Sequence, residues 1–198
     1  MAIVFHKESR CFHLYNAEVS YIIRIMENEQ LEQLYYGKRI HDRKDFAYLH
    51  EECMRSQMSI NVPEPGILSM QYTKQEFPTY GTGDYRSPAL TIAQENGSRI
   101  VNFTYAFHEI YNGKKNILPL PATYVESGDE AQTLEITLHD AVMDTDLILS
   151  YTIYEEYPVI TRNAKVSHNG SEKIVLDKIM SASVEFNDMD YEMVQLSG

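Results

Sequence analysis

Apolar and polar side chains alternate with a period of two along much of the second half of the chain. The clearest run is 147–154, in which every second residue is a large apolar one: Leu147, Leu149, Tyr151 and Ile153. The runs 135–138, 159–166 and 173–180 repeat this theme and are rich in β-branched residues. Successive side chains of a strand point to opposite faces of its sheet, so these runs are typical of half-buried strands. The pattern predicts an antiparallel β domain.

Turn signals lie between the apolar runs. Three Asn-Gly dipeptides occur, at residues 96–97, 112–113 and 169–170. A type I′ turn needs positive φ at both central residues, and Asn-Gly is the pair that tolerates this best. We therefore expect each dipeptide to close a β-hairpin. The fold prediction is all-β, a large antiparallel β-sandwich.

Residues 41–88 interrupt the strand pattern. Within them only 46–58 has apolar residues near helical spacing, and Asp45 is a suitable N-cap for a short helix there. A partly helical loop fits that stretch equally well. Pro63 and Pro65 exclude regular structure around them. We expect one long irregular, partly helical insertion near residues 41–88, and connections of this length usually carry function or form interfaces.

Composition indicates a globular protein. The chain has 198 residues, of which 43% are hydrophobic and 23% are charged, and a chain of this size can bury about 70% of its unfolded surface. No apolar run is long enough for a membrane helix, and the first residues lack a secretory pattern. The two cysteines, Cys11 and Cys53, are too few for a disulfide framework. These features lead us to expect a cytoplasmic protein with reduced thiols and no membrane partner.

The charge balance argues against nucleic acid as a partner. The formal net charge is −12, with 17 basic against 29 acidic residues, whereas phosphate binding needs clustered Lys and Arg. The only basic cluster lies at 38–44 and is interrupted by Asp42. The seven histidines have no metal-ligand spacing, and no glycine-rich phosphate loop is present. We expect neither a metal nor a cofactor.

The most distinctive segment is 76–89, which reads Glu-Phe-Pro-Thr-Tyr-Gly-Thr-Gly-Asp-Tyr-Arg-Ser-Pro-Ala. Its prolines fix φ at both ends, and its glycines allow backbone angles that are closed to other residues. This sequence motif resembles one in the N-terminal domain of the bacterial α-galactosidases of glycoside hydrolase family 36. The resemblance extends over about residues 2–198, through further matching segments at 34–38, 94–98, 120–126, 160–164 and 180–184.

The resemblance implies a β-supersandwich over residues 1–198 that is truncated at its C-terminal end. It also implies a parent enzyme that releases terminal α-galactose from melibiose- and raffinose-type sugars by a retaining mechanism. The catalytic carboxylates of that family lie in a (β/α)₈ barrel, which is absent from this chain. The resemblance further implies a homotetramer, since members of the family are often homotetramers in which an N-terminal domain reaches toward the catalytic pocket of a neighbouring subunit. In this chain 48–65 is the natural candidate, with His50 and Arg55 at the substrate rim.

Two further groups of residues are candidates for a site, each with a structural alternative. Asp84 and Arg86 either lock the irregular 76–89 segment as a charge pair or contact sugar hydroxyl groups. The four tyrosines near glycine-containing turns either form a stacking platform for sugar rings or pack in the interior: Tyr35, Tyr36, Tyr80 and Tyr85. The sequence favours the structural alternative in both cases, because a binding site needs several convergent polar groups.

The chain alone is expected to be inactive. A retaining glycosidase needs two carboxylates about 5–5.5 Å apart, and sequence spacing pairs no two acidic residues across a cleft. Asp140, Asp144 and Asp146 flank a predicted turn and are expected to face solvent. Two other classes of function remain open, a freestanding carbohydrate-binding module and a purely architectural oligomerisation domain.

Overall fold

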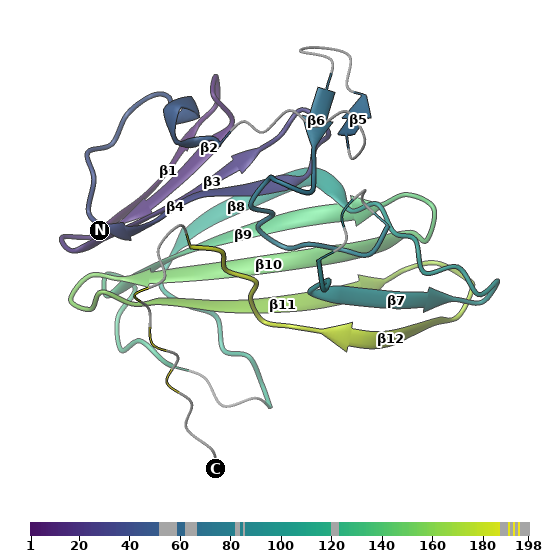
Figure 1. Cartoon of the computed structure of the whole chain (residues 1–198). Helices are drawn as coiled ribbons and strands as arrows, with labels where there is room; N and C mark the ends of the chain where they lie inside the picture. The colour runs from purple at the N-terminus through teal and green to yellow at the C-terminus, as the bar shows by residue number, and fades with distance from the viewer. Residues whose placement is uncertain are drawn as a thin grey trace.

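The computed structural model describes residues 1–51, 59–61, 67–81, 84, 86–119, 123–186, 190, 192 and 194. Two four-stranded antiparallel sheets lie face to face (Figure 1), and two smaller two-stranded sheets complete the fold. The prediction of an all-β antiparallel sandwich is therefore confirmed.

The first sheet is a meander in which each strand pairs with its neighbour in sequence, in the order β1-β2-β3-β4. Its strands are β1 (Ala2–His6), β2 (Cys11–Tyr15), β3 (Val19–Ile25) and β4 (Leu31–Lys38). Arg10 precedes β2 with φ of 55°, and Glu29 precedes β4 with φ of 65°. The side chains of these two left-handed residues form an ion pair, which links the β1–β2 turn to the β3–β4 turn.

The second sheet is also a meander, in the order β11-β10-β9-β8. Its strands are β8 (Thr104–Asn112), β9 (Ala131–Asp140), β10 (Thr145–Tyr154) and β11 (Ile160–His168). The run with the clearest alternation became β10, the strand that pairs with both β9 and β11.

The smaller sheets lie beside the sandwich. β7 (Leu90–Gln94) pairs with β12 (Ile174–Ile179), and β5 (Ser59–Asn61) pairs with β6 (Ile67–Ser69). The insertion near residues 41–88 is therefore irregular with short elements, as expected. Among its described residues the only helical element is the 3₁₀ turn η1 (Ala47–Leu49). The rest of the stretch 46–58 with helical spacing lies largely outside the described residues, at 52–58.

One main core fills the space between the two large sheets. Alternate residues of β10 are fully or almost fully buried in it: Leu147, Leu149, Tyr151 and Ile153. The first sheet contributes Phe12, Leu14 and Ile23 to the same cluster, each with no exposed surface. Burial of these side chains between two antiparallel sheets is the main source of stability expected for such a sandwich.

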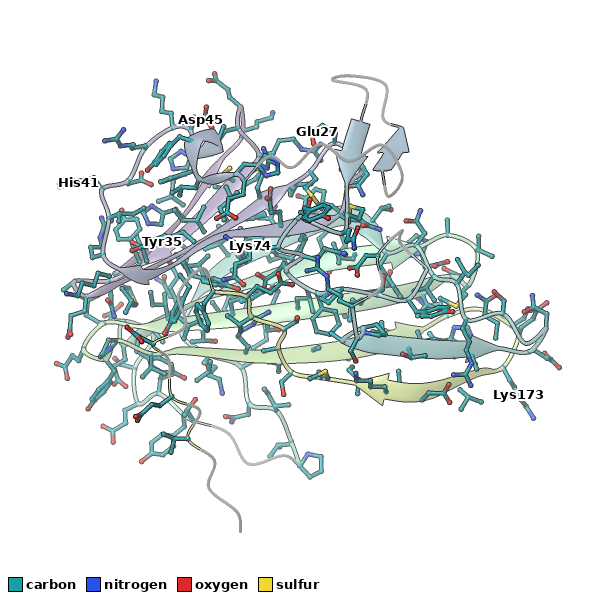
Figure 2. The ribbon with its side chains drawn as sticks, viewed as in Figure 1. Glu27, Tyr35, His41, Asp45, Lys74 and Lys173 are labelled. Atoms are coloured by element: carbon teal, nitrogen blue, oxygen red, sulfur yellow. The ribbon has the colours of Figure 1, made fainter. Side chains whose placement is uncertain are left out.

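A second, smaller core lies on the outer face of the first sheet. Residues 40–50, which we call the strap, cover this face and insert the ring of Phe46, which has no exposed surface. Phe46 packs against Cys11, Ile22 and Leu34. Figure 2 labels His41 and Asp45 on the strap and Tyr35 on the sheet beneath it.

The three hairpins expected at Asn-Gly are not formed. Residues 96–97 follow β7 and residues 169–170 lie between β11 and β12, but in both places the neighbouring strands belong to different sheets. Asn112 ends β8, and β9 begins only at Ala131. Gly97 and Gly113 have positive φ but the asparagines before them do not, so the type I′ geometry is absent. The Asn-Gly dipeptides therefore lie in longer connections rather than in tight hairpins.

Asp140 is the second correction. It was expected to face solvent, but only 2% of its surface is exposed. One of its carboxylate oxygens accepts hydrogen bonds from the backbone N–H groups of Val142 and Met143, both at 3.0 Å. The other accepts from the N–H of Asn102 at 2.7 Å. The carboxylate thus caps backbone donors of the β9–β10 turn, where sequence spacing alone showed only a charged turn residue.

Candidate functional site

The distinctive segment 76–89 begins alongside β4, an edge strand of the first sheet. The N–H of Gln33 donates to the carbonyl of Lys74 at 2.8 Å, and the N–H of Glu76 donates to the carbonyl of Leu31 at 3.0 Å. These bonds place residues 74–76 along β4. The segment then closes on itself, because the N–H of Ala89 donates to the carbonyl of Pro78 at 2.8 Å.

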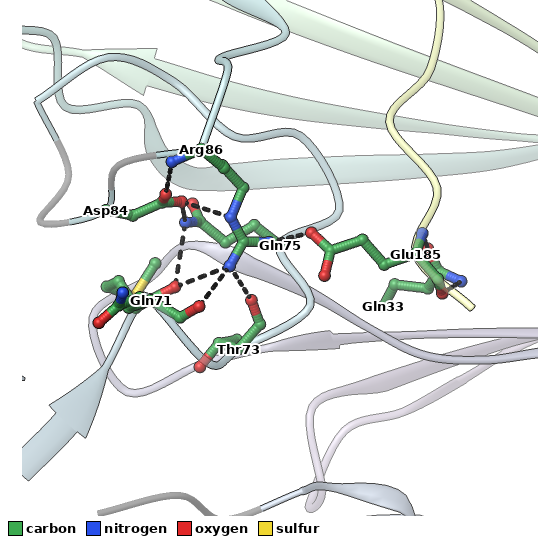
Figure 3. A network of polar contacts seen from close by, with 8 residues as sticks. Gln33, Gln71, Thr73, Gln75, Asp84, Arg86 and Glu185 are labelled. Atoms are coloured by element: carbon green, nitrogen blue, oxygen red, sulfur yellow. Dashed lines mark hydrogen bonds and ion pairs between the residues drawn. The ribbon is translucent and has the colours of Figure 1, made fainter. Parts of the chain in front are cut away.

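Arg86 is the centre of a polar network that this irregular segment makes possible (Figure 3). Its Nη2 atom donates to the backbone carbonyls of Met70, Gln71 and Thr73 at 3.2, 2.9 and 2.8 Å. Those carbonyls belong to residues 70–73, a turn that lies outside the strands. Five N–H donors in a rigid fork make arginine suited to satisfying several such acceptors at once.

Asp84 holds the guanidinium in place. Its Oδ2 atom lies 2.8 Å from Arg86 Nε, and its Oδ1 atom accepts the backbone N–H of Arg86 at 2.6 Å. The side-chain amide of Gln75 donates to the same carboxylate. Only 4% of the Asp84 side chain is exposed, against 19% for Arg86. Both carboxylate oxygens therefore have partners within the described part of the chain.

The same arginine also reaches the C-terminal part of the described chain. Arg86 Nη1 forms an ion pair with Glu185. The backbone of Glu185 exchanges two hydrogen bonds with the side chain of Gln33 on β4, at 3.3 and 3.4 Å. Residue 185 is thus fixed to the first sheet and to the 76–89 segment together.

A second polar centre lies at Glu76, between the two large sheets. Tyr21 of β3 donates to its Oε2 atom at 2.5 Å, and Tyr151 of β10 donates to its Oε1 atom at 2.8 Å. Arg162 of β11 forms an ion pair with the same Oε1 atom. Glu76 has no exposed surface, and 11% of the Arg162 side chain is exposed. One carboxylate therefore joins both sheets of the sandwich.

The burial of this cluster governs its protonation. Burial raises the pKa of the Glu76 carboxyl, and the Arg162 guanidinium opposes that shift. Burial also raises the pKa of Tyr21 and of Tyr151 well above the ordinary range, and the neighbouring carboxylate adds to it. The phenols are donors at any physiological pH, because the ionised form would place a second negative charge beside Glu76.

These two centres are built for holding the chain together. A carboxylate that acts as nucleophile or general acid needs a free oxygen near substrate. In Glu76 and Asp84 each carboxylate oxygen already accepts a hydrogen bond from the protein. The arrangement satisfies buried donors and acceptors, and it offers no free carboxylate at either centre.

The other predicted site residues lie apart from these centres. Tyr35 donates its hydroxyl to the carbonyl of Lys38 at 2.9 Å, and the ring of Tyr36 packs against Tyr21 with centroids 5.7 Å apart. Tyr80 is 49% exposed. The three tyrosines therefore have different surroundings. Tyr85, the fourth predicted platform residue, lies outside the described residues.

His50 ends the strap beside the first sheet. Its Nδ1 atom lies 2.5 Å from Oε1 of Glu32, whose Oε2 atom lies 2.7 Å from Arg24 Nη2. The side chain of His50 is 17% exposed. Arg55, the other predicted rim residue, lies outside the described residues. Their role at a substrate rim stays a prediction.

The sequence did not single out Glu76 as a functional residue, although it opens the distinctive segment. Its partners Tyr21, Tyr151 and Arg162 lie 55, 75 and 86 residues away in sequence. The signal that was available is Glu76 itself, an acidic residue directly before the apolar pair Phe77-Pro78. Within the described part of the chain, no group of three or more His, Cys, Asp or Glu side chains is placed to bind a metal ion. No helix there is long and apolar enough to cross a membrane.

Comparison with known proteins assigns the chain to a family. Residues 29–198 match the glycosyl hydrolase family 36 N-terminal domain. The α-galactosidase AgaA of Geobacillus stearothermophilus is 36% identical over 198 residues, which are 100% of this chain and 27% of AgaA. The chain belongs to glycosyl hydrolase family 36. The resemblance seen in the sequence is therefore confirmed.

Other family 36 enzymes show the same relation. The α-galactosidase Mel36A of Lactobacillus acidophilus is 31% identical over 198 residues, which are 99% of this chain and 27% of that protein. The crystal structure of AgaB from Geobacillus stearothermophilus superposes with a TM-score of 0.83 at 36% identity, over 92% of this chain and 24% of AgaB. A variant of AgaA in complex with raffinose gives 0.84 at 38% identity, over 91% of this chain and 25% of that structure. The chain thus spans about a quarter of the length of these relatives.

Proposed function

We propose that the chain is the N-terminal, non-catalytic part of an α-galactosidase that hydrolyses terminal α-D-galactosyl residues of melibiose- and raffinose-type oligosaccharides. The observation that carries this proposal is the match to AgaA along the whole chain at 36% identity. The raffinose complex of an AgaA variant, whose sandwich superposes on this chain, supports the substrate class.

Hydrolysis is assigned to a (β/α)₈ barrel outside residues 1–198, by a retaining mechanism with two carboxylates about 5–5.5 Å apart. The chain itself is assigned to assembly of a cytoplasmic homotetramer. The full hydrogen bonding of Glu76 and Asp84 supports a non-catalytic role, because neither carboxylate has an oxygen without a protein partner.

We assign residues 48–65 to the rim of the substrate pocket in a neighbouring subunit, with Arg55 as the hydrogen-bonding head and His50 beside it. The strap supports this assignment, since Phe46 and the His50–Glu32 contact hold the residues at the start of this segment against the first sheet. A fixed starting point reduces the entropy that the segment loses when it meets a ligand.

Activity assays test the proposal directly. The full-length gene product and the 198-residue chain are each assayed with p-nitrophenyl α-galactoside and with raffinose. We expect turnover by the full-length protein alone. A full-length protein that is folded and inactive on both galactosides would overturn the proposed function. Turnover by the 198-residue chain that disappears in a point variant of it would overturn the non-catalytic assignment.

The rim assignment needs its own measurement. In the full-length enzyme, Arg55→Ala is expected to raise KM for raffinose and to leave kcat nearly unchanged, since the barrel carboxylates stay in place. Arg43→Ala is the matched control, because Arg43 is an exposed arginine of the same insertion outside 48–65. Equal KM values for both variants, with an unchanged oligomer by light scattering, would show that the segment does not reach the sugar.

A further inference from the structure

The strap is held on the first sheet by a chain of hydrogen bonds as well as by the ring of Phe46. The backbone N–H of Ile40 donates to Ser20 Oγ at 3.0 Å. Ser20 Oγ lies 2.9 Å from Nε2 of His13, and Nδ1 of the same ring lies 2.7 Å from Oδ1 of Asp42. The chain therefore begins and ends on the strap and passes through β3 and β2.

The hydrogens in this chain have one consistent arrangement. Oδ1 of Asp42 also lies 2.9 Å from Nε2 of His6. An ionised carboxylate only accepts hydrogen bonds, so both imidazoles donate to it. A neutral His13 then carries its hydrogen on Nδ1, and its Nε2 atom accepts the hydroxyl hydrogen of Ser20. The serine oxygen accepts from Ile40. Every member of the chain is therefore satisfied while His13 is neutral.

Protonation of His13 breaks this arrangement. The added proton binds to Nε2, which becomes a donor and faces the hydroxyl of Ser20. The serine hydrogen then loses its acceptor at a place where neither residue has any exposed surface. Bulk water cannot replace the lost bond there, and a buried donor without a partner is costly. The closed strap therefore disfavours the protonated form of His13.

The charged groups around His13 act in both directions. Burial lowers the pKa of His13, Asp42 opposes that shift, and Arg39 and His6 add to it, so that this pKa lies below the ordinary 6.5. The ring of Tyr15 also packs against the imidazole, with centroids 4.6 Å apart. Burial raises the pKa of Asp42, but the hydrogen bonds from His13 and His6 outweigh burial and lower that pKa below 3.8. In mildly acidic solution the group that changes charge against Asp42 is therefore an imidazole and not the carboxylate.

His13 is also part of the apolar contact beneath the strap. The centroid of its ring lies 5.1 Å from that of Phe46. Phe46 in turn packs against Cys11, which has no exposed surface. This smaller core is separate from the main core between the two large sheets. Its opening would therefore expose Cys11 and leave the main core closed.

We propose that the strap is a pH-sensitive cover: protonation of His13 in mildly acidic solution releases residues 40–50 from the first sheet and exposes Cys11, while the sandwich stays folded. The proposal is independent of the proposed function, because every residue that it needs lies within this chain and none of them has to meet a sugar or another subunit.

Release of the strap takes up a proton. The pKa of His13 lies below 6.5 while the strap is closed and returns to its ordinary value of about 6.5 when the ring meets water. The open form therefore binds more protons than the closed form below this pH. The equilibrium constant for opening rises as pH falls, by at most a factor of about ten per pH unit for one proton.

Labelling of Cys11 measures this opening. The 198-residue chain is treated with 4,4′-dithiodipyridine, which reacts with thiols in acid as well as at neutral pH. Mass spectrometry of the peptide that contains Cys11 separates it from Cys53. The rate in the folded chain is divided by the rate in the urea-unfolded chain at the same pH, which removes the titration of the thiol itself. We expect this ratio to rise about tenfold between pH 7 and pH 5.

Urea distinguishes release of the strap from unfolding of the whole chain. The effect of urea grows with the surface that an opening exposes. Lifting of residues 40–50 exposes little surface, so the ratio should hardly change between 0 and about 1 M urea. Global unfolding exposes both cores and would make the ratio rise steeply over the same range.

Variants assign the pH dependence to one ring. In His13→Gln the ratio should no longer depend on pH, whatever its level. His139→Gln is the matched control, because His139 forms a similar contact with Asp146, at 2.8 Å, on the second sheet; it should show the pH dependence of the original chain. Asp42→Asn changes a partly exposed residue of the strap itself and removes the charge that both imidazoles face. It should raise the ratio about tenfold already at pH 7.

Four results would each overturn the proposal. The first is a ratio that stays constant between pH 7 and pH 5 in the original chain. The second is a rise that persists in His13→Gln, and the third is one that disappears in the His139→Gln control. The fourth is a ratio that rises with urea as steeply as global unfolding does. An unchanged ratio in Asp42→Asn at pH 7 would show that Asp42 does not hold the strap and would overturn it as well.

Discussion

Replacing Glu76 by glutamine should destabilise the sandwich strongly although it hardly changes the shape of the side chain. Glu76 has no exposed surface, and its ion-pair partner Arg162 has 11% of its side chain exposed. Removing one member of a buried pair leaves an uncompensated charge, which costs about 3–5 kcal/mol. The phenols of Tyr21 and Tyr151 also lose a charged acceptor. We expect a total loss of about 4 kcal/mol.

Urea unfolding of the 198-residue chain, followed by circular dichroism, measures this loss. With a slope of about 2 kcal/mol per molar urea, the midpoint should fall by about 2 M. Glu172→Gln is the control, because Glu172 is exposed and the substitution is chemically identical. Its midpoint should not move.

A double variant separates the loss of charge pairing from other effects. Combining Glu76→Gln with Arg162→Met removes both charges, so the double variant should be more stable than Glu76→Gln alone. A loss below about 1 kcal/mol in the single variant would refute the reasoning, since it would mean that Arg162 needs no buried counter-charge. Strict additivity of the two substitutions would refute it as well.

Three further outcomes follow from the same geometry. Asp84→Ala should lower the melting temperature of the chain by about 5–10 °C, since it leaves Arg86 without its buried partner; an unchanged value in a calorimeter would contradict the network. Phe46→Ala should lower the free energy of unfolding in urea by about 3–5 kcal/mol. Tyr48→Ala, at a ring that is 61% exposed, should lower it by almost nothing. Equal losses would contradict the burial of Phe46 in the smaller core beneath the strap. Burial lowers the pKa of His13 below its ordinary 6.5, so the unfolded chain binds a proton at His13 more readily, and the free energy of unfolding should fall as pH drops below about 6.5. His13→Gln should flatten this dependence between pH 6.5 and 5. A dependence that persists unchanged in the variant would contradict the assignment to His13.

The strands of the second sheet could be predicted because their pattern depends only on neighbours in sequence. In β10 the alternation of Leu147, Leu149, Tyr151 and Ile153 marks the face that enters the core. Turn geometry was harder to predict. The left-handed residues before β2, β4 and β10 are Arg10, Glu29 and Asp144, none of which is a glycine, while the Asn-Gly dipeptides serve longer connections. A turn type depends on which strands meet, and a local motif does not contain that information.

The polar centres show the same limit. Asp84 and Arg86 are two residues apart, so their pairing could be foreseen from the irregular segment around them. Glu76 could not be assigned a role, because that role depends on its contacts with Tyr21, Tyr151 and Arg162, which lie on three strands distant in sequence. Likewise one of the three backbone donors to Asp140 is the N–H of Asn102, from another part of the chain, which the spacing of the acidic residues could not reveal.

The placement of Glu76 also has a consequence for the order of folding. Each large sheet is a meander of consecutive strands, over residues 2–38 and 104–168, so each can assemble from contacts between sequence neighbours, which form quickly. The Glu76 carboxylate needs Tyr21 from one meander and Tyr151 and Arg162 from the other. It can be fully bonded only when both meanders have docked. Closure of the sandwich is then the step at which the charged side chain of Glu76 leaves water. A half-closed sandwich, in which Glu76 is buried but not yet paired with Arg162, is therefore unfavourable compared with both the open and the closed state.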